Sequence, residues 1–237
     1  DVFESLGLNF DEFFELKKLE IIYKIFFGNG ENLSLSTDKE VMRSQLEKIE
    51  PGSAQKAEKY VSEGYRIFRL GMKKLVGRNF YHIFQIVNFR NLGLLVRLKV
   101  FISNWAYAKK FFRHPHLLMA YTFQNIYVGQ SPFNSPALFA MVPAAELTEG
   151  SFFPRGGMYL IAEKLLTAAR SSGVNFFYNS AATKIVLNGK KAVGIILENG
   201  TEIKADLIIA NADLPFVYRE LLPDRGISKR LDRMKYS

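Results

Sequence analysis

The sequence predicts a mixed α/β protein in two parts, a helical and basic first part and a second part in which a helix is followed by short strands. In the first part, residues 64–145 hold 11 Lys or Arg and no Asp or Glu, and their apolar residues recur at helical spacing. In the second part, from Gly157 onward, short apolar runs alternate with Asn-Gly turns. With 237 residues, 48% of them hydrophobic, the chain is long enough to bury a substantial core.

The chain is expected to open with a short helix over residues 2–8, followed by a β-hairpin. Residues 18–27 alternate like a strand, Gly28-Asn29-Gly30 forms the turn, and residues 32–35 return. Gly28 and Gly30 do not form a dinucleotide fingerprint, because no third glycine follows and no helix opens behind them.

Two helices are predicted next. Thr37 and Glu40 have the spacing of a capping box, which predicts a helix to about Glu50. Pro51-Gly52-Ser53 ends this helix, and the apolar spacing beyond it predicts a second one that reaches Val76.

A long helix is predicted over residues 92–112, where apolar residues three and four apart form one stripe beside a basic arc. Two interpretations remain open: a helix that lies in a membrane surface, or an ordinary helix docked on a core. The missing carboxylates favour an anionic membrane surface. Nucleic acid is not expected, because the basic residues are interleaved with large apolar ones and no nucleic-acid motif is present. The residues predicted to face the membrane are Lys99, Trp105, Lys109, Lys110 and Arg113.

The second part is expected to contain a helix over residues 158–171, ended by Gly173, and a further helix from about Pro215. Between these helices lie the predicted strands, which cover residues 174–178, 182–187, 192–197, 201–204 and, as a buried strand, 205–210.

Composition limits the chemistry. The chain has no cysteine, which excludes disulfides, thiolate metal sites and cysteine nucleophiles. Its three histidines, His82, His114 and His116, are too few and too clustered for a convincing metal centre, so no metal is predicted. The chain opens at Asp1 without a signal-peptide pattern, and no apolar run is long enough to span a bilayer.

The stretch from Phe153 to Leu160 joins the two parts. Gly156 and Gly157 lie between Arg155 and the predicted helix, which indicates a backbone turn that a bulky, anionic group approaches. A plain entry from a loop into a helix is the alternative.

Six stretches together carry a family resemblance. They are Pro154-Arg155-Gly156-Gly157-Met158, residues 123–133, residues 136–143, residues 173–179 (Gly-Val-x-Phe-x-x-Asn), residues 198–213 ending in Asn211-Ala212-Asp213, and residues 218–223. With them the sequence resembles the flavin-dependent carotenoid desaturases of bacterial and fungal type, which include phytoene and diapophytoene desaturases. The resemblance implies an α+β substrate domain inserted in a discontinuous FAD-binding domain of the amine-oxidase-like, Rossmann type.

The resemblance also implies a division of the chain. Residues 1–150 are expected to form a substrate-binding, membrane-facing domain, residues 151–213 the return into the FAD-binding domain, and residues 214–237 the start of the next substrate-domain segment. The Gly-x-Gly-x-x-Gly unit and the C-terminal flavin-contacting segment of that family are not in this sequence. The chain by itself is therefore expected to hold FAD weakly and to be inactive.

The cofactor site implied by the resemblance has three parts. Arg155, Gly156 and Gly157 match the turn next to the flavin, and Ala182 matches the position whose backbone faces the adenine. Asn211, Ala212 and Asp213 match the strand end beneath the dinucleotide, and Asp213 is also read as a helix N-cap. No catalytic residue is assigned. His114 and His116 stand where relatives carry acidic and arginine residues, so that segment is either a surface turn or an acid-base site.

The function implied by the resemblance is desaturation of a linear C30 or C40 carotene such as phytoene, by hydride transfer to FAD. The substrate is a lipophilic polyene, so the enzyme is expected at the cytoplasmic side of a membrane as a peripheral, monotopic protein. A carotene isomerase, a carotenoid oxidase and a retinol saturase of the same fold remain alternatives, as does a membrane-binding module without enzymatic activity. The residues predicted to line the substrate tunnel, instead of belonging to plain core, are Phe123, Tyr127, Phe133 and Phe139.

Overall fold

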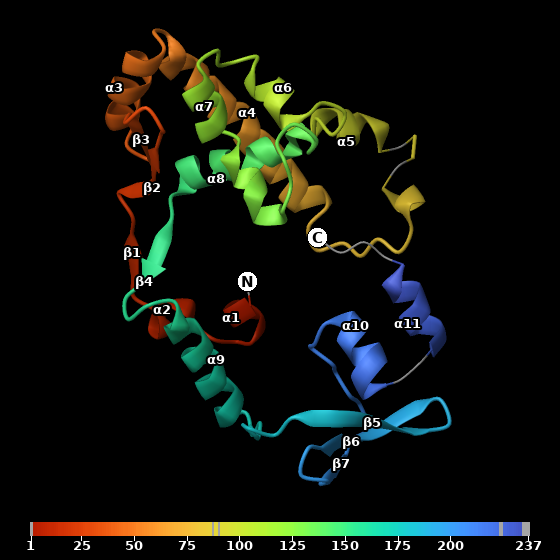
Figure 1. Ribbon diagram of the computed structural model, residues 1–237. Helices are drawn as coiled ribbons and strands as arrows, with labels where there is room; N and C mark the ends of the chain where they lie inside the picture. Colours follow the sequence, from red (N-terminus) through yellow and green to blue (C-terminus); the bar gives the residue numbers. More distant parts are fainter. Residues whose placement is uncertain (1, 87, 90, 223–224, 234–237) are drawn as a thin grey trace. The chain divides into compact units, whose positions relative to one another are not determined.

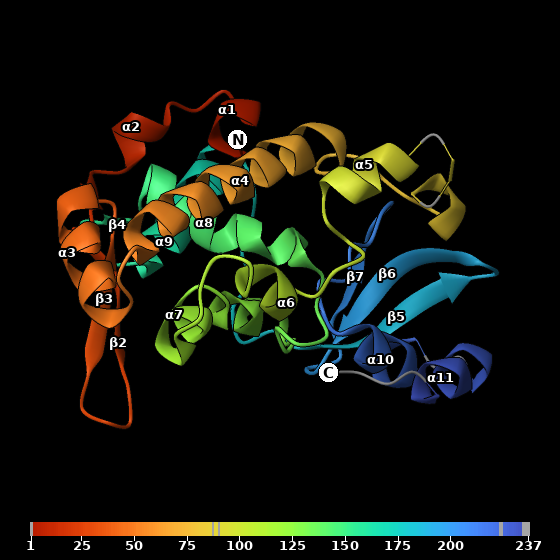
Figure 2. The same ribbon diagram turned by 90° about the horizontal axis from the view of Figure 1, so that it is seen from above.

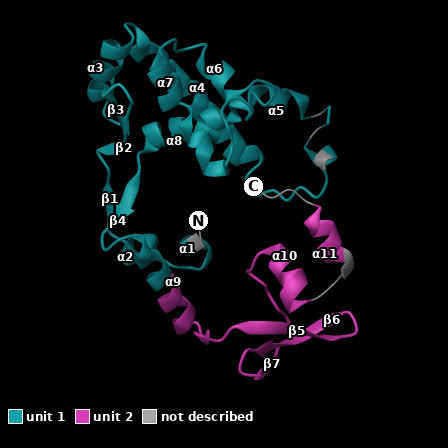
Figure 3. Cartoon of the chain, viewed as in Figure 1, with its two compact units in different colours: residues 1–164 teal, residues 165–237 magenta. Residues whose placement is uncertain are grey.

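A computed structural model describes residues 2–86, 88–89, 91–222 and 225–233. The chain forms two compact units, residues 1–164 and residues 165–237 (Figure 1, Figure 3). Both units mix helices and strands, which confirms the mixed α/β class. Within the described ranges, no helix is both long enough and apolar enough to cross a bilayer.

The first unit is mostly helical, with two small antiparallel pairs of strands. Its elements are α1 (Val2–Ser5), α2 (Phe10–Phe13), β1 (Leu16–Lys18), β2 (Ile21–Phe26), β3 (Asn32–Ser36), α3 (Lys39–Ile49), α4 (Ser53–Lys74), η1 (Ile83–Gln85), α5 (Leu92–Arg97), α6 (Asn104–Ala108), α7 (Pro115–Ala120), η2 (Phe123–Val128), η3 (Ala137–Ala140), α8 (Met141–Glu149) and β4 (Phe152–Pro154). Helix α9 (Tyr159–Ser171) begins in the first unit and ends in the second.

The predicted hairpin is confirmed as the antiparallel pair β2 and β3, with Tyr23 opposite Leu35. Leu33 and Leu35 of β3 are fully buried and anchor the hairpin to the core. A second pair was not predicted: β1 runs antiparallel to β4, with Leu16 opposite Pro154. Strand β4 comes directly before the glycine turn, and its pairing with β1, near the start of the chain, holds it in place.

The capping box predicted at Thr37 is wrong by one residue. Asp38 is the N-cap of α3, and its side chain accepts hydrogen bonds from the backbone N–H groups of Glu40 and Val41 at 2.9 and 3.1 Å. A carboxylate at this position also meets the positive end of the helix dipole, which a threonine hydroxyl does less well.

The core of the first unit surrounds Tyr60, which is fully buried on α4. Its ring lies 5.3 to 5.7 Å from four aromatic rings, and its hydroxyl donates to the backbone carbonyl of Tyr121 at 3.0 Å. Figure 2 shows α4 lying beside α8, the helix that leads into β4. The four rings belong to Tyr107, Phe111, Phe112 and Tyr121.

The long helix predicted over residues 92–112 is wrong, because the chain there is broken into α5 and α6. Lys99 has a positive φ of 55°, and Ser103 starts α6 by accepting a hydrogen bond from the N–H of Ala106. Serine and asparagine favour helix starts over helix interiors, and the β-branched residues just before Ser103 weaken the helix further. The predicted apolar stripe is therefore not one surface: Phe101 is exposed, whereas Leu98 and Phe112 are buried.

The second unit contains a three-stranded antiparallel sheet in the order β5 (Ala182–Asn188), β6 (Lys191–Leu197) and β7 (Glu202–Lys204). These strands and both Asn-Gly turns agree with the prediction. The helices that follow are α10 (Leu214–Phe216), the π-helix η4 (Val217–Leu221) and α11 (Arg225–Asp232). Val217 and Leu221 pack with Ile185 of β5 as a small core.

Two predicted strands of this unit are wrong. Residues 174–178 and residues 205–210 are irregular. Leu207 and Ile209, expected to be buried, are 77% and 84% exposed. A strand needs a partner for its backbone groups. In the described part of the chain, Ala205 donates its backbone N–H to Val193 of β6 at 3.0 Å, but no strand is paired with residues 205–210.

Candidate functional site

The glycine turn before α9 has the geometry that a close backbone approach requires. Gly156 and Gly157 have φ values of +94° and +96°, which side chains with a Cβ rarely adopt. The turn is fixed at its start, because Arg155 donates its backbone N–H to Glu15 at 2.9 Å and its Nε pairs with the same residue's carboxylate at 2.9 Å. Both side chains are exposed. The bare backbone, with an arginine beside it, fits an anionic group such as a nucleotide phosphate.

The other residues predicted for the cofactor site lie in the second unit. Ala182 begins β5 opposite Leu197. Asn211, Ala212 and Asp213 are exposed in the segment before α10. Asp213 stands at the N-cap of α10, as predicted, although its side chain makes no capping hydrogen bond. That these residues and the glycine turn form a single site stays a prediction.

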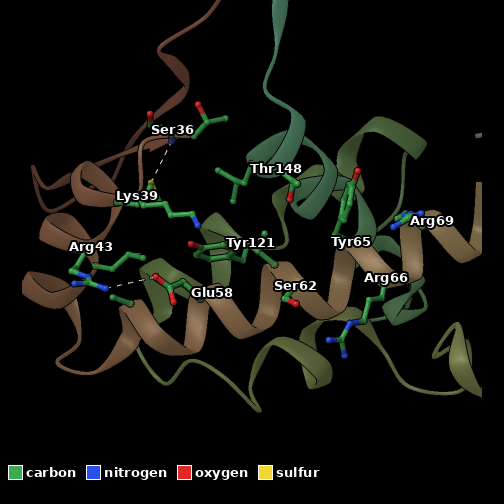
Figure 4. Close-up of a pocket in the computed structure, with 17 residues that line it drawn as sticks. Ser36, Lys39, Arg43, Glu58, Ser62, Tyr65, Arg66, Arg69, Tyr121 and Thr148 are labelled. Carbon is green, nitrogen blue, oxygen red and sulfur yellow. Dashed lines mark hydrogen bonds and ion pairs between the residues drawn. The ribbon is translucent and has the colours of Figure 1, made fainter.

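The first unit contains a pocket of about 630 Å³ between α3, α4, α8 and the end of the β2–β3 hairpin (Figure 4). Its floor is apolar, and Tyr121 lies on it. None of the four residues predicted for the tunnel is among the described residues that line it. The apolar side chains of the floor belong to Met42, Leu46, Ala54, Ala57, Val61 and Leu147.

The rim of this pocket is basic. Arg43 forms a long ion pair with Glu58 at 3.9 Å, and both side chains are well exposed. Lys39, Arg66 and Arg69 form no ion pair with any described residue. In Figure 4 the Lys39 side chain reaches toward Tyr121. An apolar floor below unpaired cations suits an apolar ligand delivered from an anionic surface.

A polar cluster that the sequence did not indicate surrounds Glu146 on α8. The Tyr23 hydroxyl donates to Glu146 Oε1 at 2.9 Å, the Tyr127 hydroxyl donates to the same oxygen at 3.3 Å, and the two hydroxyls also contact each other. Burial raises the pKa of the Glu146 carboxyl, and its contacts with Tyr23, Tyr127 and Gln124 offset this only in part. Burial, followed by its bonds to Tyr127 and Glu146, raises the pKa of Tyr23. Tyr23 lies 104 residues before Tyr127 and 123 residues before Glu146, so no short motif in the sequence indicates the cluster.

The residues predicted for the tunnel lie in different surroundings. Phe123 packs edge-on against Tyr23 with 5.1 Å between ring centroids, which places it beside the Glu146 cluster together with Tyr127. Phe133 instead packs on Trp105 at 4.7 Å. Phe139 lies on η3 and is partly buried.

The residues predicted to face a membrane are not equivalent. Lys99 pairs with Glu63 at 3.7 Å and lies over the Tyr107 ring at 4.8 Å, so it belongs to the fold of the first unit. Trp105 is partly buried against the core. Lys109, Lys110 and Arg113 are exposed.

The two histidines of the 114–116 segment have structural roles. His114 caps α7 by accepting a hydrogen bond from the N–H of His116 at 3.3 Å. The His116 ring stacks on the Phe27 ring with 3.7 Å between centroids, and its Nδ1 lies 3.0 Å from the Glu31 carboxylate. The segment ties the β2–β3 hairpin to α7.

Comparisons with known proteins give a consistent result. The family model of flavin containing amine oxidoreductases matches residues 103–236. A zeta-carotene-forming phytoene desaturase from Myxococcus xanthus is 30% identical over 100% of this chain and 46% of its own length. A phytoene desaturase from Phycomyces blakesleeanus is 32% identical over 94% of this chain and 39% of its own length. For a 4,4'-diapophytoene desaturase from Staphylococcus aureus, the identity is 28% over 94% of this chain and 45% of that protein. The chain thus spans less than half the length of each of these curated relatives. These matches confirm the resemblance that the sequence indicates.

Proposed function

Because the chain belongs to the family of flavin containing amine oxidoreductases, we propose that it takes part in the FAD-dependent desaturation of a linear C30 or C40 carotene such as phytoene. The observation that carries the proposal is the similarity to a phytoene desaturase along the whole chain, including the first unit, where a substrate domain is expected. The apolar floor of the pocket supports an apolar substrate.

The residues proposed to contact the cofactor are Arg155, Gly156 and Gly157 in the glycine turn of the first unit and, in the second unit, Ala182 and residues 211–213. When bound, the flavin supplies the hydride acceptor, and the protein positions the substrate and keeps water away. Arg155 would offer its guanidinium to a phosphate in exchange for its exposed ion pair with Glu15. The two glycines, which carry no side chain, would let the backbone come close.

The substrate offers no hydrogen-bonding groups, so recognition must come from shape and apolar contact. We place one part of the polyene on the pocket floor, and another beside Phe123 and Tyr127. The cations on the rim would then meet the phosphates of the membrane that holds the substrate.

A peripheral membrane position accords with this substrate. The exposed aromatic side chains of the segment from residue 76 to residue 101 are better suited to contact a membrane than the set predicted from the sequence. In that set, Lys99 forms an ion pair and Trp105 packs against the core. Phe84 is 78% exposed and Phe89 is 98% exposed, in a region of the sequence without a single carboxylate. Aromatic and basic residues together are typical of a surface that dips into the head-group region.

The test uses the full-length protein loaded with FAD, on phosphatidylglycerol liposomes that carry phytoene. Desaturation should move the visible absorption band to longer wavelength as conjugated double bonds accumulate. A spectrum that does not change, while flavin is bound and phytoene is present in the membrane, would contradict the proposal. Coloured carotenes and retinol would then be tested, because the isomerase and saturase alternatives act on them.

A further inference from the structure

One of the two carboxylate oxygens of Glu146 receives no hydrogen bond from the described residues. Oε1 accepts both tyrosine hydroxyls, whereas Oε2 is buried and has no hydrogen-bond partner among the residues that the structure describes. Buried carboxylate oxygens are normally hydrogen-bonded, so an unused one marks a place where a proton or a donor can be taken up.

Gln124 is a second buried polar side chain at this site, and it also points to a polar function there. Its side chain is 2% exposed and faces the Glu146 carboxyl closely enough to lower its pKa. Neither amide atom of Gln124 makes a hydrogen bond of normal geometry within the described ranges. A donor and an acceptor are thus held beside Glu146, although packing alone would favour an apolar side chain at such a position.

Tyr127 connects the carboxyl to the surface on which the polyene is proposed to lie. Its side chain is 52% exposed, yet its hydroxyl reaches Glu146 Oε1. Phe123, one residue before Gln124, packs on Tyr23 and extends the same apolar surface. Of the four residues predicted for the tunnel, Tyr127 alone has a side chain that can exchange a proton.

We propose that Glu146 is the proton acceptor of the desaturation, that it acts through the Tyr127 hydroxyl, and that Gln124 and Tyr23 position its carboxyl. This inference rests on the proposed function and assigns the base that the sequence leaves unassigned. Tyr127 would touch the substrate, and Glu146 would act behind it as the group that stores the proton.

The step balances. When bound, the oxidised flavin would supply the acceptor for the hydride, hydrogen and electron pair together, that one carbon of the polyene would lose. The neighbouring carbon loses a proton, and the electron pair left behind forms the new C=C bond. Tyr127 accepts that proton on its oxygen while its own hydroxyl proton passes to the Glu146 carboxylate. The carboxyl then releases the proton to solvent before the next turnover.

The protonation state of the Glu146 carboxyl determines how the desaturation rate should depend on pH. The groups known to face Glu146 are Tyr23 on β2, Tyr127 and Gln124 on η2, and none of them carries a charge near neutral pH. The reaction needs the carboxylate form. Because burial raises the pKa of Glu146, the rate should rise with pH through a value above the ordinary range of a glutamate.

The experiment uses the full-length, FAD-loaded protein on phytoene liposomes, with Glu146→Gln, Tyr127→Phe and the control Glu149→Gln. Glu149 lies on the same helix and also accepts a tyrosine hydroxyl, from Tyr65 at 2.9 Å, but in an exposed position. Glu146→Gln should slow desaturation by about 100-fold or more and remove the rise with pH. Tyr127→Phe should slow it in the same direction, Glu146→Asp should restore part of the rate, and Glu149→Gln should match the unmodified protein.

A second readout needs neither flavin nor turnover. An infrared titration of the flavin-free protein should show the carbonyl band of a protonated carboxyl that persists above the ordinary glutamate range. This band should be absent in Glu146→Gln and retained in Glu149→Gln. A Glu146→Gln variant that desaturates within about threefold of the unmodified protein, with the same pH profile, would overturn the assignment and leave the desaturase proposal intact. An unmodified protein that fails to desaturate phytoene would overturn both.

Discussion

Gly157 occupies a backbone conformation that few other residues tolerate. Its φ is +96°, and a Cβ built there would meet no atom within 4 Å, so the requirement for glycine is conformational and not steric. Gly173, which follows the other end of α9, has the same properties, with φ at +82° and open space around it. The two positions differ in that Gly157 lies in the proposed flavin turn.

This pair gives a controlled test of the cofactor site in the full-length protein. Gly157→Ala and Gly173→Ala should each destabilise the fold by a similar amount, about 1–3 kcal/mol, because both put a Cβ at positive φ. Gly157→Ala alone should lower the flavin retained per protein, measured by absorbance after gel filtration, because its turn would shift away from the phosphate. Equal flavin content in the two variants would remove the turn from the cofactor site.

The roles of single residues could be predicted from the sequence only where neighbouring residues form a recognisable pattern. Two adjacent glycines between an arginine and an amphipathic helix predict a turn, and the structure contains it. Glu146 was not predicted, because its partners Tyr23 and Tyr127 lie 123 and 19 residues away, and a single glutamate in an apolar helix carries no spacing signal. Asp38 replaced Thr37 as the cap because either residue type starts a helix, and the choice depends on backbone geometry.

Helix α4 packs closely against the end of η3 and the start of α8. At Gly64, in the middle of α4, a Cβ would lie 2.7 Å from the backbone oxygen of Ala140 and 2.7 Å from Cβ of Ala144. One of these atoms belongs to the backbone, so it has little freedom to move. The glycine is therefore a packing requirement, although it weakens the helix itself.

We expect Gly64→Ala to lower the free energy of unfolding by about 1–3 kcal/mol, because the added methyl group forces the two helices apart. Gly71→Ala on the same helix is the matched control: it is also buried, but the nearest atom to its Cβ would be Met141 Sδ at 3.9 Å. That change should raise stability by up to about 1 kcal/mol through helix propensity. Urea denaturation measures both, and a shift of the same sign and size in the two variants would contradict the packing argument.

The elements that were predicted correctly are those with a strong local pattern. The β2–β3 hairpin, α4, α9 and the β5–β6–β7 sheet follow from turn residues and apolar spacing. The long helix over residues 92–112 failed because apolar residues spaced three and four apart were taken as one helix, while Ser103 and Asn104 start a new one. Asn104 then donates its side-chain amide to Asn125 at 2.6 Å inside the core, a contact that spacing alone does not reveal.

At the scale of the whole molecule, the sequence predicted two parts of different character but not how each completes its own strands. Residues 205–210 have the composition of a buried strand, yet burial depends on a paired strand. Among the described residues no strand pairs with them, and the contact of Ala205 with Val193 of β6 does not continue along the segment. Conversely, β1 pairs with β4, which lies more than 130 residues later in the sequence. Each strand has only three residues, which is too short a pattern to predict this pairing. Local composition thus predicts that a segment favours a strand, and the rest of the chain decides whether it becomes one.

Charge and exposed aromatic residues together predict how the full-length protein meets a membrane. Replacing Phe84, Phe89 and Phe101 with serine removes three exposed rings, which we expect to lower binding to liposomes by at least about tenfold, whether the lipid is neutral or anionic. Reversing the exposed charges at Lys109, Lys110 and Arg113 should lower binding only to anionic liposomes, and less so in high salt.

Sedimentation with phosphatidylcholine and with phosphatidylglycerol liposomes separates the two contributions. The control replaces Phe26 and Phe177, which are 72% and 71% exposed but lie outside the segment from residue 76 to residue 101, and it should bind like the unmodified protein. If the control loses as much binding as the triple variant, exposed aromatic rings act wherever they lie, and the segment is not a specific docking surface. If only the charge reversal matters, the protein stays above the head groups, and the polyene must reach the pocket by leaving the bilayer without help from inserted side chains.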